Sequence, residues 1–148
     1  MTSLSFTKNL STPRGLGPRQ GSRPADLDPA RDSGAGLRTF FRIMDAWEVD
    51  PEPARAILGA PKATFYKWRR NPDAARLTRD QFERLSYVFG IYKALQILLP
   101  NASIADSWVN QPNTAATFGG HRPIELMARG KVVDLFKVRQ YLDAERGW

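Results

Sequence analysis

A capping box followed by a long, two-faced apolar pattern is the feature that most restricts the fold of this chain. Thr78 and Gln81 stand three residues apart and predict the first turn of a helix that continues to about Leu99. One apolar stripe contains Phe82, Leu85, Phe89, Tyr92 and Leu99, and a second contains Val88, Ile91, Leu95 and Leu98. Such a helix is roughly 33 Å long and is packed on both sides. We expect the second stripe to form a dimer interface with another copy of the chain.

Three shorter helices are predicted before the long one. An apolar stripe of Leu37, Phe40, Phe41, Met44 and Trp47 fits one face of the first. Asp50 and Pro51 predict the start of the second, which ends at Gly59. Pro61 opens the third, and Pro72 breaks it.

The chain after the long helix has the same helical character. A short helix is expected over residues 103–110, with Ile104, Trp108 and Val109 on it, and a loop over 111–122. Another short helix starts at Pro123 and ends at Gly130. A last helix follows over residues 131–144, and its predicted inward side chains are Val132, Leu135, Phe136, Val138 and Leu142. No run alternates apolar and polar residues over the length of a strand, so the predicted fold class is all-α.

Residues 1–36 differ from the rest of the chain. Proline and glycine interrupt every apolar periodicity there, and the apolar residues are isolated. Such a segment buries too little apolar surface to offset the entropy of ordering it. We therefore expect a mostly disordered tail (1–36), a helix-turn-helix region (37–77), and a last part (78–148) that holds the long dimerisation helix and a small helical domain.

The composition excludes several classes of site. The chain has 148 residues and no cysteine, which rules out disulfides and cysteine-based metal or iron–sulfur sites. The single histidine, His121, has no second metal-ligating partner nearby, and phosphate-loop, dinucleotide-binding and nucleophile-elbow motifs are absent. No apolar run has the length of a membrane span, and no targeting segment is visible. We expect a cytoplasmic protein that is not an enzyme and uses no metal or cofactor.

Positive charge is concentrated in one window. The chain carries a formal charge of +7 at pH 7, and a stretch of 16 residues holds five cations and no Asp or Glu. A short helix, a glycine turn and a basic second helix describe a helix-turn-helix, with Phe65 and Trp68 facing its core. The expected DNA contacts are Arg55, Lys62, Thr64, Tyr66, Lys67, Arg69 and Arg70. The alternative is a solvated helix face without a ligand.

Two segments resemble a known family. Residues 50–70 are similar to an Xre-type helix-turn-helix. The pattern Asn113-x4-Phe118-x-Gly120-x-Arg122-Pro123-x3-Met127-x2-Gly130 precedes a closing helix and resembles the toxin-binding domain of the Xre/MbcA/ParS antitoxins. The resemblance covers about residues 37–148. It implies a type II antitoxin that binds a RES-domain, NAD-consuming toxin and covers its active site. It also implies a dimer that binds operator DNA and represses its own operon.

The resemblance and the exposed charges together place the toxin-binding residues in the last part of the chain. These residues are Asn113, Phe118, Gly120, Arg122, Arg129, Lys131, Lys137, Arg139, Arg146 and Trp148. For Asn113 and Gly120, a structural role in the loop is the favoured alternative. The alternative function is a stand-alone helix-turn-helix repressor whose C-terminal domain only dimerises. A third possibility is a scaffold that binds protein but no DNA.

Overall fold

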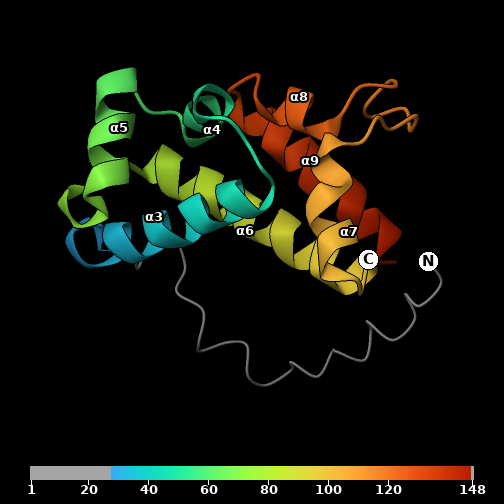
Figure 1. Ribbon diagram of the computed structural model, residues 1–148, viewed down its shortest axis with the longest axis horizontal. Helices are drawn as coiled ribbons and strands as arrows, with labels where there is room; N and C mark the ends of the chain where they lie inside the picture. Colours follow the sequence, from blue (N-terminus) through green and yellow to red (C-terminus); the bar gives the residue numbers. More distant parts are fainter. Residues whose placement is uncertain (1–27, 148) are drawn as a thin grey trace.

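The computed structural model describes residues 28–147, and every regular element in this range is a helix (Figure 1). The elements are α3 (Pro29–Ala46), α4 (Pro51–Leu58), α5 (Lys62–Arg70), the 3-10 turn η3 (Pro72–Ala74), α6 (Arg79–Leu98), α7 (Ala102–Ser107), the 3-10 turn η4 (Trp108–Asn110), α8 (Pro123–Met127) and α9 (Val132–Glu145). The all-α prediction is confirmed. None of these described helices is long and apolar enough to cross a membrane.

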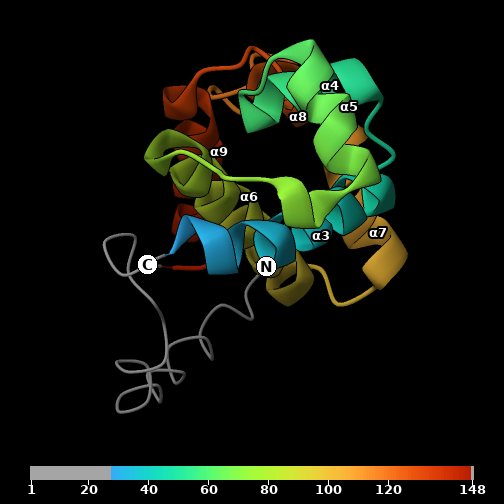
Figure 2. The same cartoon turned by 90° about the vertical axis from the view of Figure 1, so that its left-hand side faces the viewer.

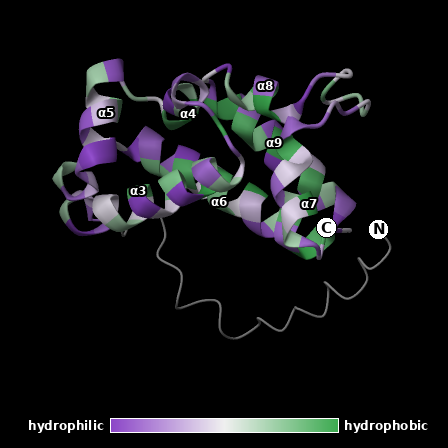
Figure 3. Cartoon of the chain, in the orientation of Figure 1, coloured by the Kyte–Doolittle hydropathy of each residue, from purple (hydrophilic) through white to green (hydrophobic). Residues whose placement is uncertain are grey.

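Helix α6 is the central element, and it joins the two halves of the fold. It contacts α3 and α4 along one part and α7 and α9 along another (Figure 1; Figure 2). The capping box predicted at its start is present: Gln81 N–H donates to Thr78 Oγ1 over 3.1 Å, and Thr78 N–H donates to Gln81 Oε1 over 2.9 Å. Hydrophobic segments recur along α6 and α9, whereas hydrophilic bands dominate α5 (Figure 3).

Helix α3 begins at Pro29, so residues 29–36, which we expected in the disordered tail, are helical. Asp28 caps the helix by accepting a hydrogen bond from Ala30 N–H over 3.0 Å. Gly34 is buried where η3 comes close, and a Cβ there would lie 2.6 Å from an Asp73 carboxylate oxygen. The glycines that suggested disorder thus permit close packing against a segment far along the chain. The rest of the predicted tail, residues 1–27, lies outside the described residues.

The second apolar stripe of α6 belongs to the core of this chain. Val88 and Ile91 are fully buried, Leu95 is 1% exposed, and Leu98 is partly buried. The cover is α9, which packs along α6 and contributes the buried side chains Leu135, Val138 and Leu142. The assignment of this stripe to a dimer interface is therefore corrected. The sequence pattern shows that both faces of the helix are covered, but it does not show by which chain.

The prediction that Phe136 faces inward is wrong, because its side chain is 41% exposed. Ile104, on the short helix that follows α6, is 55% exposed. The predicted helix over residues 103–110 is present as α7 followed by η4. The Asn110 side-chain amide donates to the Trp47 carbonyl over 2.7 Å and ties this segment to the end of α3.

Candidate functional site

Helix α5 separates its apolar and cationic residues cleanly. Phe65 is fully buried and packs edge-to-face on Phe41 of α3, with ring centroids 5.6 Å apart, and Trp68 is 9% exposed. Lys62, Lys67 and Arg70 are exposed and make no salt bridge with the described residues, whereas Thr64 and Tyr66 are half-buried. The Tyr66 ring rests edge-on against Phe65 at 5.3 Å. Of the seven predicted DNA-contacting residues, three are therefore exposed cations without a salt bridge among the described residues, and Arg69 is a fourth exposed cation that has an acidic partner.

Arg55 and Arg69 are engaged with carboxylates from outside the basic window. Arg55 pairs with Glu52, and this hydrogen bond lowers the pKa of the Glu52 carboxyl. Arg55 also donates to the Ala60 carbonyl over 2.9 Å, which ties α4 to the following turn. Arg69 lies 3.7 Å from an Asp45 carboxylate oxygen, with its guanidinium 5.5 Å from the centre of the Phe41 ring. The basic window contains no Asp or Glu, but two of its arginines pair with carboxylates from other parts of the chain.

The turn between α4 and α5 is fixed by residues of α6. Gly59 ends α4 with φ of 76°, a conformation that favours glycine. The Gln81 side-chain amide donates to the Gly59 carbonyl over 3.1 Å, and Arg84 Nη1 lies 3.3 Å from the carbonyl oxygens of Ala56 and Ile57. These contacts satisfy carbonyl groups that the end of a helix leaves unpaired. The capping-box pattern predicts only the local hydrogen bonds of Gln81, and no sequence pattern points to Arg84, because the partners of both side chains at this turn are more than 20 residues away.

The loop over residues 111–122 is closed by its own backbone. Asn113 N–H donates to the His121 carbonyl over 3.0 Å, and Gly120 N–H donates to the Asn113 carbonyl over 2.8 Å. Asn113 Oδ1 accepts from Ala115 N–H over 2.9 Å, and Gly120 has φ of 90°. Both residues therefore hold the shape of the loop, in agreement with the structural alternative.

Phe118 anchors the loop in the core, and its placement on the toxin surface is corrected. Its side chain is 4% exposed, with ring centroids 5.7 Å from Trp108 and 5.1 Å from Tyr141. Trp108 and Tyr141 stack at 6.2 Å, which completes a cluster of three rings. A ring buried in this way supports the loop from beneath and exposes only a small edge to the surface.

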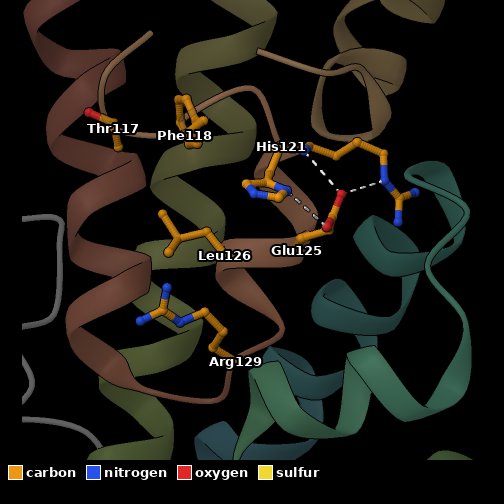
Figure 4. Close-up of a pocket in the computed structure, with 7 residues that line it drawn as sticks. Thr117, Phe118, His121, Glu125, Leu126 and Arg129 are labelled. Atoms are coloured by element: carbon orange, nitrogen blue, oxygen red, sulfur yellow. Dashed lines mark hydrogen bonds and ion pairs between the residues drawn. The ribbon is translucent and has the colours of Figure 1, made fainter. Parts of the chain in front are cut away.

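A hollow of about 270 Å³ opens beside the loop (Figure 4). It is lined by Thr117, Phe118, His121, Arg122, Glu125, Leu126 and Arg129. Glu125 accepts from the Arg122 backbone N–H over 3.1 Å and from Arg122 Nε over 3.0 Å. These hydrogen bonds, the backbone one foremost, lower the pKa of the Glu125 carboxyl. His121 Nδ1 lies 3.6 Å from the same carboxylate.

The other predicted toxin-binding residues divide into exposed and buried groups. Arg122, Arg129, Lys131 and Lys137 are exposed. Arg139 is half-buried and donates to Asp143 over 3.1 Å. Arg146 was predicted to be exposed but is only 4% exposed, and burial lowers the pKa of its guanidinium.

The remaining predictions concern Trp148 and metal binding. Trp148, also assigned to the toxin surface, lies outside the described residues. Within residues 28–147, no three His, Cys, Asp or Glu side chains gather as a metal site would require.

Comparisons with known proteins divide the chain into two domains, one that contains α5 and one that contains α7 to α9. Residues 26–90 match the Antitoxin Xre-like helix-turn-helix domain, and residues 94–147 match the Antitoxin Xre/MbcA/ParS C-terminal toxin-binding domain. Over 131 residues the chain is 42% identical to the Uncharacterized protein y4oB of Sinorhizobium fredii, covering 88% of this chain and 97% of that protein. The two family matches meet within α6, which joins the cationic face of α5 to the domain of α7 to α9. The chain therefore belongs to the Xre-type antitoxin family, with a helix-turn-helix domain and a C-terminal toxin-binding domain.

Proposed function

We propose that this chain is a type II antitoxin that neutralises a RES-domain, NAD-consuming toxin and represses its own operon. The observation that carries the proposal is the joining, in one folded chain, of an open cationic helix-turn-helix face and a toxin-binding domain. In this proposal the toxin-binding domain covers the active site of the toxin. The protein acts in the cytoplasm and has no enzymatic activity of its own.

The DNA-binding part of the proposal rests on Lys62, Lys67 and Arg70. Their charges project from α5, while Phe65 and Trp68 hold the helix on its own core. Cations in this arrangement neutralise phosphates and release counterions, so we expect binding to the operator to weaken steeply with salt. We propose that the chain binds DNA as a dimer, through a surface other than the buried stripe of α6.

The toxin-binding part rests on the exposed surface of residues 113–147. Arg122, Arg129, Lys131 and Lys137 are the predicted toxin-binding residues that remain open to a partner. Arg122 and Arg129 line the hollow beside the loop, and Lys131 and Lys137 lie at the start and in the first half of α9. A partner that binds here would meet a surface with a surplus of positive charge.

The test uses the full-length chain, because α9 covers the core residues of α6 and truncation would expose them. The candidate toxin is the protein encoded by the adjacent reading frame in the same operon. We expect its expression alone to stop growth and deplete NAD, and co-expression with this chain to restore both. We also expect the chain to shift a DNA fragment from upstream of the operon.

The alternatives give different results in the same test. A stand-alone repressor would shift the DNA but would neither bind the candidate toxin nor restore growth. A scaffold would bind protein and leave the DNA unshifted at every salt concentration. Failure of the full-length chain to bind the candidate toxin would contradict the antitoxin proposal.

A further inference from the structure

Two large apolar side chains are exposed on the outward face of α9. Among the described residues, the large hydrophobic side chains that are clearly exposed are Ile104, Val133 and Phe136, at 55%, 50% and 41%. Val133 and Phe136 stand three residues apart on α9 and share one face of it. Single exposed apolar residues are ordinary on protein surfaces, but neighbouring ones on the same helix face beside a groove indicate a candidate binding surface.

Two grooves flank this face. One is lined by Tyr87, Phe136, Arg139, Gln140, Asp143 and Ala144. The other is lined by Ala116, Thr117, Lys137, Gln140, Tyr141 and Ala144. Gln140 and Ala144 line both grooves, so the outer edge of α9 forms a ridge between them. A partner that straddles this ridge would bury Phe136 on one side and the stem of Lys137 on the other.

The side chains of the first groove are held in place. The Phe136 ring packs edge-to-face on Tyr87 of α6, with centroids 5.9 Å apart. Arg139 lies against the backbone of α6 at Gly90, where a Cβ would be 1.6 Å from Nη1, and it also pairs with Asp143 at 3.1 Å. An aromatic ring fixed in this way loses little conformational entropy when a partner covers it.

The cations at the start and middle of α9 favour a partner that carries carboxylates. Lys131, Lys137 and Arg129 are exposed near the start and middle of α9. Of the carboxylates near the ridge, Asp134 is 1% exposed and pairs with Arg129, and Asp143 pairs with Arg139, whereas Glu83 beside Tyr87 and Glu145 remain exposed. Lys131 and Lys137 make no salt bridge with the described residues, so a partner with carboxylates at this end of α9 would complement them.

We propose that the α9 ridge, defined as Val133, Phe136, Lys137, Gln140 and Ala144, is the primary docking surface for the toxin, with Phe136 as its central anchor. Phe136 enters an apolar pocket of the toxin, and carboxylates at the rim of that pocket pair with Lys137 and Lys131. Aromatic side chains at the centre of an interface carry a large share of the binding energy. This inference rests on the proposed antitoxin function and identifies the part of the toxin-binding domain that makes the contact.

The test measures the affinity of the candidate toxin for the full-length chain and its Phe136→Asp variant. We expect at least a tenfold increase in Kd, on the order of a hot-spot residue. The matched control is Ile104→Asp, which places the same charge at an exposed apolar position outside both grooves. This control should bind as the parent chain does. A second variant, Lys137→Glu, changes an exposed side chain and should weaken binding about fivefold without affecting the fold.

Each outcome bears on the inference. Thermal unfolding by circular dichroism verifies that the variants are folded, and if Phe136→Asp fails to fold, Lys137→Glu decides. Folded variants that bind like the parent chain overturn the docking surface and leave the antitoxin function standing. A parent chain that does not bind the candidate toxin overturns both. A change in the oligomeric state of the isolated Phe136→Asp chain, measured by light scattering, shows that a second copy covers the ridge and also overturns the inference.

Discussion

The outer faces of α5 and α9 are both open to solvent, but they expose different chemistry. On α5 the exposed residues are cationic, and the apolar residues Phe65 and Trp68 are turned to the core. On α9 the buried face is complete without Val133 and Phe136, which remain exposed on the other side. A cationic face suits a polyanion, and an apolar face with a cationic rim suits a protein. The outer faces of α5 and α9 therefore suit different classes of ligand, although the two helices belong to the same chain.

Replacing Ile91 by Ala should give the largest change in stability, because this residue is fully buried between α6 and its cover. We expect the free energy of unfolding to fall by about 2–5 kcal/mol, measured by urea denaturation. The oligomeric state of the folded chain should not change, because this stripe lies in the core. If Ile91→Ala lost a dimer without losing stability, the second stripe of α6 would be an interface between chains, contrary to this prediction.

The double change Lys67→Ala/Arg70→Ala should weaken operator binding and leave toxin binding intact. Removing two phosphate contacts should reduce the salt dependence, the slope of log K against log salt, by about 2. Fluorescence anisotropy over a salt series measures this slope. The matched control, Lys93→Ala/Lys131→Ala, removes the same charge from exposed positions outside α5. An equal loss of slope in the control would show that only total charge matters.

Replacing Ser33 by Ala tests the earlier start of α3. Ser33 is fully buried, and its Oγ accepts a hydrogen bond from Leu77 N–H over 2.9 Å. The change leaves this buried N–H without a partner, which should cost about 1–3 kcal/mol in urea denaturation. An unchanged stability would place residues 29–36 outside the folded domain.

The smallest expected effect is on the stability of the fold at low pH. Pairing with Arg55 lowers the pKa of Glu52 below its ordinary value of 4.5, so its contribution to stability is present above that pH. The contribution is lost as the pH falls through the lowered pKa of the folded state. Glu52→Gln should therefore flatten the decline in stability between about pH 5 and pH 3. Urea denaturation at both pH values measures it, and an unchanged decline would show that the pair does not contribute.

The elements were largely predictable because their signals are local. The capping box of α6, the proline start of α4 and the glycine end at Gly59 each lie within a few residues of what they determine. The buried face of α5 was also predictable, because Phe65 and Trp68 stand three residues apart and therefore share one side of the helix.

The features that were not predictable depend on residues far apart in the chain. Asp45 reaches Arg69 from α3, so the basic window gave no sign of it. The sequence around Gly34 suggests a break in the helix, whereas in the structure Gly34 allows η3 to pack closely against α3. Phe118 and Arg146 belong to motifs and charge patterns that suggest a surface, and only the packing of the C-terminal domain buries them. On α9 the apolar residues exceed those that one face can bury, and the sequence does not indicate that Phe136 stays outside.

We propose that the outer faces of α5 and α9 bind two separate ligands, operator DNA and the toxin. The most direct test measures the affinities of Lys67→Ala/Arg70→Ala and Phe136→Asp for both the operator DNA and the candidate toxin. We predict that the α5 variant loses affinity for DNA and keeps its affinity for the toxin. The α9 variant should lose affinity for the toxin and keep its affinity for DNA. A folded variant that loses both ligands, or two folded variants that lose neither, would contradict the claim.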